Sequence, residues 1–171
     1  MPKLLARLHR LALVLAVALP AAAPLALPVA ASASSGQSEL QCLAEALYFE
    51  ARGEPLAGQK AVAEVILNRR DSGRFPSSVC GVVTQGSKAG CQFSYNCGGK
   101  RRAIREKAAY MRVKKVAEAA LAGAPRNLTG GATYFHTPAV RPSWSRKFTR
   151  TTRIGSHIFY RTGGSRKLAS N

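Results

Sequence analysis

Acidic residues are scarce in this chain of 171 residues, which carries eight Asp and Glu against 26 Lys and Arg. No carboxylate side chain follows Glu118, so the whole C-terminal part of the chain lacks one. The net charge of +18 favours an anionic partner, such as nucleic acid, lipid head groups or an acidic cell-wall polymer. A mechanism that needs two carboxylates must draw both from a short set: Glu39, Glu45, Glu50, Glu54, Glu64, Asp71, Glu106 and Glu118.

A long uninterrupted apolar run is also missing. The apolar stretch from Leu11 to Leu19 follows a positively charged start, and Ala31-Ser32-Ala33 offers a small-residue cleavage site. Pro20, Pro24 and Pro28 interrupt the rest, which argues against a membrane-spanning helix of about 20 residues. We therefore predict a signal peptide over residues 1–33 and a periplasmic or secreted protein after cleavage near Ala33. An uncleaved N-terminal anchor is the alternative.

The chain that remains is long enough for one domain with a buried core. We predict a linker over residues 34–38, one domain over residues 39–165 and a tail over residues 166–171. Export makes nucleic acid the least expected anionic partner. We expect a monomer that binds no nucleic acid and has electrostatic contact with anionic envelope polymers.

The four cysteines are an even number in a chain predicted to be exported, which favours disulfides over free thiols. Three connectivities are open, and we favour Cys91 with Cys97 and Cys42 with Cys80. A zinc site that joins Cys91 and Cys97 to a histidine is one alternative, although the spacing fits no zinc motif well. A thiol nucleophile paired with a histidine is another. We predict no metal and no cofactor.

Apolar spacing predicts a mostly helical α+β domain. Two helices, over residues 39–50 and from the Gly53/Pro55 turn to about Asn68, are followed by a short turn that Ser78 caps, through Val83. Residues 86–99 form a loop held by disulfides, and residues 100–122 form the longest helix. Its predicted buried stripe is Ile104, Ala108, Met111 and Val116, with Leu121. Two aromatic segments, residues 133–136 and 157–160, are predicted strands of a small sheet.

Glu50 is the acid whose setting best suggests catalysis. It follows Leu47, Tyr48 and Phe49 at a helix end, and partial desolvation there raises the pKa of a carboxyl towards the range useful for proton donation. Glu54 precedes the second helix, where its charge would stabilise the helix start. We expect the remaining glutamates to be surface residues of helices: Glu39, Glu45, Glu64, Glu106 and Glu118.

Five blocks of this chain resemble the SleB/CwlJ-type cell wall hydrolases. They are CLAEALYFEARGEPLAGQKAVAEVILNR (42–69), FPSSVCGVVTQ (75–85), CQFSYNCGGK (91–100), GGATYFHTPAVRPSW (130–144) and IGSHIFYR (154–161). The resemblance covers nearly all of the chain after the predicted signal. Members often carry an acid soon after the second cysteine of the third block, where this chain has Gly98 and Gly99.

This resemblance implies a goose-lysozyme-like or lytic-transglycosylase-like domain with a small C-terminal β element. It also implies a peptidoglycan glycosidase that cleaves the MurNAc-β-1,4-GlcNAc bond, with Glu50 as its catalytic acid. We favour a lytic transglycosylase, because that route needs no second protein carboxylate; a hydrolytic muramidase and a non-catalytic cationic cell-wall-binding module are the alternatives. The residues expected to contact the glycan are Gln92, Phe93, Ser94, Tyr134 and His136. The first three could instead belong to a structural loop held by a disulfide, and the last two could be strand residues of the core, with His136 as a hydrogen-bonded structural histidine.

Overall fold

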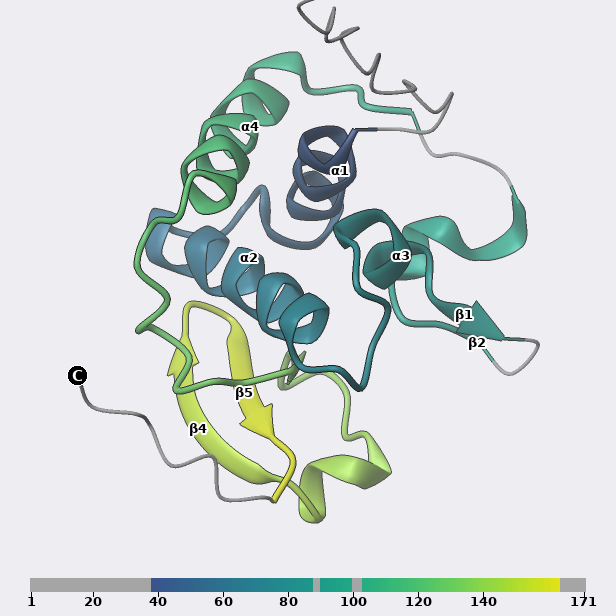
Figure 1. Cartoon of the computed structure of the whole chain (residues 1–171), viewed down its shortest axis with the longest axis vertical. Helices are drawn as coiled ribbons and strands as arrows, with labels where there is room; N and C mark the ends of the chain where they lie inside the picture. The colour runs from purple at the N-terminus through teal and green to yellow at the C-terminus, as the bar shows by residue number, and fades with distance from the viewer. Residues whose placement is uncertain (1–37, 88–89, 100–102, 164–171) are drawn as a thin grey trace, which may run out of the picture. The chain divides into compact units, whose positions relative to one another are not determined.

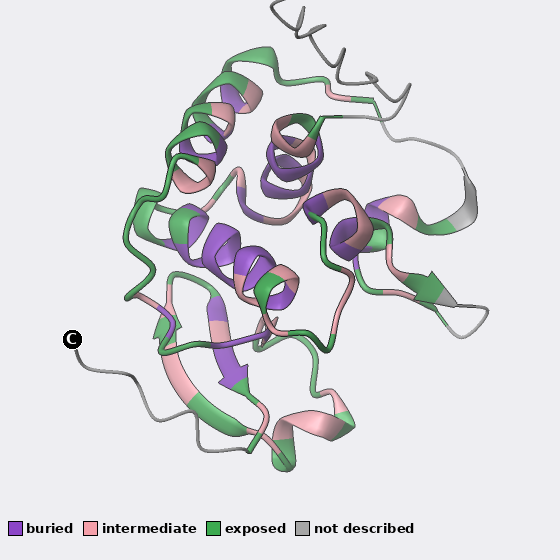
Figure 2. Cartoon of the chain, viewed as in Figure 1, coloured by how far each residue is buried: buried purple, intermediate pink, exposed green. Residues whose placement is uncertain are grey.

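Two helices supply most of the buried apolar surface. α1 (Glu39–Ala51) begins at Ser38, whose side chain accepts a hydrogen bond from the Gln41 backbone N–H at 3.1 Å. α1 is buried on nearly all sides, as Figure 2 shows, because α2, α3 and α4 all pack against it. The computed structural model describes residues 38–87, 90–99 and 103–163. The predicted signal peptide, most of the linker and the predicted tail lie outside these residues.

α2 (Leu56–Asp71) occupies the centre of the domain, with α1 and α4 on one side and the strands β4 and β5 on the other (Figure 1). It follows Pro55, a residue suited to the start of a helix, and buries an apolar face that includes Val62, Val65 and Ile66. α3 (Val79–Thr84) begins at Ser78, whose hydroxyl accepts from the Gly81 backbone N–H at 3.0 Å. The predicted cap at Ser78 is therefore confirmed.

A three-stranded antiparallel sheet covers the opposite side of α2. Its strand order is β3 (Tyr134–His136), β5 (His157–Arg161) and β4 (Thr149–Ile154), so β5 is the middle strand. β4 was not predicted, because its sequence TRTTRI is polar and its residues are at best half-buried. The region from residue 86 to 99 was predicted as a loop but contains β1 (Gly86–Ser87), β2 (Gly90–Cys91) and a 3-10 helix, η1 (Ser94–Gly99). A second 3-10 helix, η2 (Ser143–Arg146), precedes β4.

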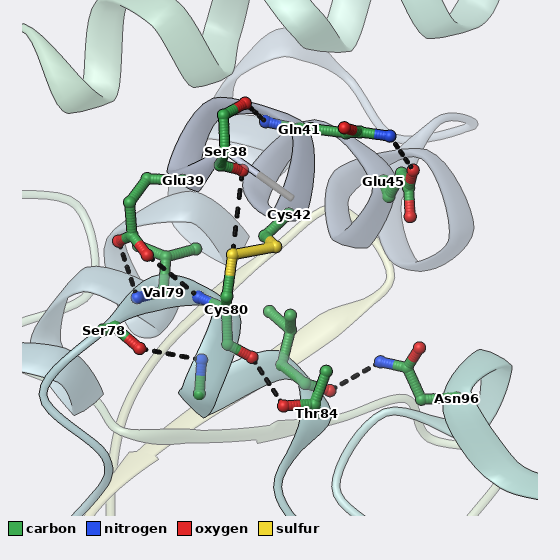
Figure 3. Close-up of a disulfide and its surroundings, with 12 residues drawn as sticks. Ser38, Glu39, Gln41, Cys42, Glu45, Ser78, Val79, Cys80, Thr84 and Asn96 are labelled. Atoms are coloured by element: carbon green, nitrogen blue, oxygen red, sulfur yellow. Dashed lines mark hydrogen bonds between the residues drawn. A yellow bond between two sulfur atoms is a disulfide. The ribbon is translucent and has the colours of Figure 1, made fainter. Parts of the chain in front are cut away.

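Two disulfides hold α1, α3 and η1 in place. Cys42 is bonded to Cys80, which joins α1 to α3 (Figure 3). Cys91 is bonded to Cys97. Both predicted pairs are confirmed, and since all four cysteines are bonded, the zinc site and the thiol nucleophile are ruled out. Glu39 accepts hydrogen bonds from the backbone N–H groups of Val79 (2.7 Å) and Cys80 (3.3 Å) beside the first bridge. The prediction that Glu39 is an ordinary solvated residue is therefore wrong.

The longest predicted helix begins later than expected. α4 (Lys107–Leu121) starts seven positions after residue 100, and residues 100–102 lie outside the described part. Its buried face consists of Ala109, Val113, Val116 and Ala117, whereas Met111 is 52 % exposed and Ala108 is also exposed. Only Val116 of the predicted stripe is buried in the helix. Among the described residues, no helix is both long and apolar enough to cross a membrane.

Candidate active site

Glu50 lies in the last turn of α1, one residue before the helix ends. Its neighbour Phe49 stacks on Tyr95 of η1, with ring centroids 4.7 Å apart, so aromatic surface lines this end of the helix. Glu50 is half-buried, and burial raises the pKa of its carboxyl while the charge of Arg69 opposes the rise. A carboxyl with a raised pKa holds its proton at higher pH, as a general acid requires.

Arg69, near the end of α2, is a buried cation surrounded by aromatic rings. It is 4 % exposed, and its guanidinium carbon lies 5.3 Å from the ring centroid of Phe75, 5.5 Å from that of Phe93 and 5.4 Å from that of Tyr134. Its Nε donates a hydrogen bond to the Thr133 carbonyl at 2.6 Å. Burial lowers the pKa of Arg69 to about 10, so the side chain still carries its charge at neutral pH.

Glu54, the second carboxylate of the turn after α1, is committed to the sheet. Its Oε2 accepts from the Ser156 backbone N–H at 3.0 Å, and its Oε1 accepts from the Ser156 hydroxyl. Its Oε2 also lies 3.9 Å from Nδ1 of His157. Burial acts to raise the pKa of Glu54, but the bonds from Ser156 and the proximity of His157 outweigh it and hold the pKa below its usual range. Glu54 thus ties the start of α2 to the β4–β5 turn, a contact that the predicted helix-start role did not include.

A cavity of about 340 Å³ opens beside the end of α1. Phe49 and Arg52, the residues on either side of Glu50 and Ala51, both line it. Arg52 is held by an ion pair to Glu106 at 2.8 Å and by a hydrogen bond from Nη1 to the Tyr48 carbonyl at 3.1 Å. The cavity therefore combines aromatic and basic side chains near the end of α1. Its lining residues are Phe49, Arg52, Ser94, Tyr95, Ala103 and Arg105, and Glu50 is not one of them.

The three predicted glycan contacts of the η1 region are placed differently from one another. Ser94 is exposed and lines the cavity, and Gln92 is exposed outside its lining. Phe93 is 2 % exposed and packs against Arg69. A side chain that is enclosed in this way supports the site from within the core, so Phe93 does not offer a surface to a glycan.

Tyr134 of β3 joins the Arg69 cluster to a second aromatic group. Its ring lies 5.2 Å from that of Trp144 and 4.7 Å from that of Phe148, and it is half-buried. Trp144 and Phe148 are stacked on each other at 5.6 Å and are also half-buried. The arrangement leaves part of each ring accessible, as a sugar-contacting surface requires.

His136 is fixed by hydrogen bonds on both ring nitrogens. Its Nδ1 lies 2.8 Å from the Thr137 carbonyl, and its Nε2 lies 3.1 Å from the Tyr160 hydroxyl. Since a carbonyl only accepts, Nδ1 carries the proton and Nε2 accepts from the tyrosine. This agrees with the interpretation of His136 as a hydrogen-bonded histidine of the sheet.

Comparison with known sequences identifies the family of this chain. Residues 53–160 match the model of a family described as Cell Wall Hydrolase. The chain belongs to the cell wall hydrolase family. The matched span begins three residues after Glu50, at the glycine of the turn that follows α1.

Relatives among curated proteins are spore cortex-lytic enzymes. That of Halalkalibacterium halodurans is 37 % identical over 132 residues, which are 74 % of this chain and 36 % of the relative. That of Bacillus cereus is 34 % identical over 128 residues, 72 % of this chain and 44 % of the relative. The chain therefore spans less than half the length of these two relatives.

Two solved structures share the fold. The catalytic domain of the germination-specific lytic transglycosylase SleB from Bacillus anthracis superposes with a TM-score of 0.59 at 34 % identity, covering 75 % of this chain and 99 % of that one. The catalytic domain of the Bacillus cereus SleB protein gives a TM-score of 0.57 at 35 % identity, covering 75 % and 94 %. The predicted SleB/CwlJ-type family and mainly helical α+β, lysozyme-like fold are confirmed.

Sequence reasoning gave no role to Arg69 and expected Glu64 at the surface. Glu64 is 3 % exposed and accepts from the backbone N–H groups of Leu128 and Thr129, each at 3.0 Å, so this cell wall hydrolase uses it to fix the chain before β3. The apolar spacing of α2 contained a signal for Arg69, because residue 69 falls on the same face as Val65 and Ile66. An arginine at a core position of an apolar face indicates a buried charge with a specific partner.

Proposed function

We propose that this cell wall hydrolase is an exported peptidoglycan glycosidase that cleaves the MurNAc-β-1,4-GlcNAc bond with Glu50 as its acid and base. The observation that carries the proposal is the contrast between Glu50 and Glu54. Glu50 is half-buried with a raised pKa, whereas Glu54 is hydrogen-bonded to Ser156 with a lowered pKa. Opposite shifts in two neighbouring carboxyls are typical of a site in which one of them donates a proton.

In the first step, Glu50 donates its proton to the glycosidic oxygen while the bond from that oxygen to C1 of the MurNAc sugar breaks. The GlcNAc side leaves as an alcohol, and Glu50 is left as a carboxylate. The same carboxylate then takes the proton of the C6 hydroxyl of the MurNAc sugar as O6 bonds to C1. The product is a 1,6-anhydro sugar, and Glu50 has regained its proton.

Transglycosylation is favoured over hydrolysis because the other nearby carboxylates are occupied. Glu54 binds Ser156, and Glu106 is paired with Arg52. An inverting hydrolase needs a second carboxylate to activate water, and a retaining one needs a second carboxylate as nucleophile. The Bacillus anthracis SleB protein, whose catalytic domain shares this fold, is described as a lytic transglycosylase, which is consistent with this choice.

The glycan is proposed to lie along the cavity beside α1. Ser94 lines that cavity, and Gln92, Tyr134 and His136 are proposed to contact sugars on either side of Glu50. The half-buried Phe49 ring would cover the apolar face of a sugar, while Arg52 and Arg105 suit the carboxylates of peptidoglycan. The high net charge suits anionic envelope polymers, and the predicted signal over residues 1–33 would deliver the protein, as a monomer, to the periplasm or outside.

Loss of a single carboxyl tests this proposal. Glu50→Gln should reduce the release of soluble fragments from purified peptidoglycan by at least about 100-fold, because a positioned general acid contributes that much. Glu45→Gln is the matched control in the same helix, where the Gln41 amide donates to the Glu45 carboxylate at 3.0 Å, and it should retain near-normal activity. A Glu50→Gln protein that solubilises peptidoglycan like the unmodified protein would overturn the proposal.

A further inference from the structure

We propose that Arg69 is the positioning residue of the site: a fixed cation that stabilises Glu50 as a carboxylate once its proton has gone to the leaving oxygen. The proposal rests on the function proposed above, since it assumes that Glu50 exchanges a proton during the reaction. Arg69 itself transfers no proton and keeps its charge throughout.

The Arg69 guanidinium is held so that it cannot turn towards solvent. Three rings from separate parts of the chain, Phe75, Phe93 and Tyr134, surround it at 5.3 to 5.5 Å from its central carbon. The hydrogen bond from Nε to the Thr133 carbonyl fixes the direction of the group. Burying a charged group that is only 4 % exposed costs free energy, because the charge loses its hydration. The cost is offset only where the protein supplies compensating interactions for the charge.

One nitrogen of this cation, Nη1, is the feature that the resting contacts leave unexplained. Nη1 of Arg69 is fully buried and has no hydrogen-bond acceptor among the described residues. Buried donors are nearly always satisfied, so a buried charged donor without an acceptor calls for a specific explanation, such as a catalytic role. An acceptor that gains a negative charge during the reaction would supply the missing partner.

Glu50 is the group that acquires such a charge. Its neighbour Phe49 is linked to Arg69 by packing, since Phe49 stacks on Tyr95, and Tyr95 contacts the same Phe93 ring that lies against Arg69 at 5.5 Å. Arg69 is also the charge that opposes the raised pKa of Glu50, and Glu50 in turn favours the charged form of Arg69.

The other groups near Glu50 and Arg69 have different partners and do not take the place of either residue. Tyr134 of β3 faces the guanidinium as a ring, and the Glu54 carboxylate is turned towards Ser156 and His157. Arg52, two residues after Glu50, pairs with Glu106.

Burial and Arg69 therefore act on Glu50 in opposite directions. Burial favours the protonated acid that the first step consumes, and the fixed cation favours the carboxylate that the second step uses to remove the C6 proton. A residue that must serve as acid and then as base in one reaction needs both influences. Removal of the cation should strengthen the acid form and slow the overall reaction.

The direct test is a titration of Glu50 that does not depend on activity. The carboxyl carbon of Glu50 is followed by NMR in ¹³C-labelled protein, with its signal assigned through Glu50→Gln. In Arg69→Met, the titration midpoint should rise by about one pH unit or more, which is the size of shift that a close opposite charge causes. In Arg69→Lys, which keeps a positive charge, the rise should be less than half as large. A folded Arg69→Met protein with an unchanged midpoint would overturn the inference.

Cleavage of peptidoglycan by the Arg69 variants provides a second test. Arg69→Met should lower kcat on peptidoglycan by about tenfold or more with a smaller change in KM, because each unit of pKa shift corresponds to a tenfold change in the stability of the carboxylate. The alkaline limb of its pH profile should move to higher pH. Arg69→Gln, which retains a donor for the Thr133 carbonyl, replaces the Met variant if that protein does not fold. A merely structural role would lower stability and leave both the midpoint and the limb in place.

The two proposals fail separately. If Arg69→Met shifts the midpoint but Glu50→Gln still cleaves peptidoglycan, the coupling stands and the proposed function is wrong. If Glu50→Gln is inactive and the midpoint of Arg69→Met is unchanged, the proposed function stands and Arg69 is not its positioning residue.

Discussion

The Glu54 carboxylate receives two hydrogen bonds from Ser156, a residue 102 positions further along the chain. This contact joins the turn that follows α1 to the turn between β4 and β5. Gly155 makes it possible: a Cβ at that position would collide with Oε2 of Glu54, and its φ of 58° also favours glycine. Since Glu50 lies four residues before Glu54, the contact fixes the segment that presents the candidate acid.

Glu54→Gln should destabilise the protein by about 1–3 kcal/mol, the cost of losing a charge-assisted acceptor for a partly buried pair. Because the folded-state pKa of Glu54 is lowered, this stability is present above its unfolded pKa of about 4.3 and is lost as the pH falls through the folded value. Urea unfolding at pH 7 and at pH 3 measures both effects. If Glu54→Gln abolished cleavage without loss of stability, Glu54 would be a reacting group instead.

His157 should make the free energy of unfolding depend on pH above the range in which Glu54 titrates. Burial lowers its pKa, the nearby Glu54 only partly offsets this, and its Nδ1 has no hydrogen-bond partner among the described residues. Between its folded pKa and the usual value of about 6.5, the unfolded chain binds the extra proton, so stability should rise with pH in that window.

The measurement is the free energy of unfolding at several pH values between 5 and 7. His157→Phe, whose ring can pack in the same place between Phe135 and Phe159, should remove this part of the slope. An equal slope in both proteins would show that His157 is not its source.

Glu64→Ala should cost about 3 kcal/mol or more. The substitution leaves the backbone N–H groups of Leu128 and Thr129 and the Thr129 hydroxyl, which lies 2.5 Å from the carboxylate, without their acceptor. Glu118→Ala is the control, because Glu118 is half-exposed and forms a surface ion pair with Lys114 of the same helix, so its loss should change stability by less than about 0.5 kcal/mol. Denaturant unfolding compares the two; similar values would contradict the structural role of Glu64.

Local features of the chain could be predicted, whereas most contacts between residues far apart in the sequence, the Cys42–Cys80 disulfide excepted, could not. The helix that carries Glu50, the cap at Ser78 and the two aromatic strands all depend on neighbours within a few residues, and each was predicted. Arg69 meets rings from three separate segments, and Glu64 binds a loop 64 residues away, so neither role has a local signature beyond an ionisable residue on an apolar helix face.

The start of α4 shows a second limit of prediction from the sequence. Its basic N-terminal flank continues the composition of a solvated helix, yet the helix begins only after Glu106. The Tyr48 hydroxyl accepts hydrogen bonds from the backbone N–H groups of Arg105 and Glu106 at 3.1 and 3.0 Å, which fixes the chain just before α4. A tertiary contact therefore decides a boundary that residue propensities leave open.

The most direct test of the central claim is mass spectrometry of the fragments released from purified peptidoglycan. The intact protein should produce fragments with 1,6-anhydro-muramic ends, and Glu50→Gln should reduce them by at least about 100-fold. Reducing muramic ends would contradict transglycosylation and indicate a hydrolase. Fragments cut in the stem peptides, or unchanged anhydro products from Glu50→Gln, would contradict a glycosidase that uses Glu50 as its acid.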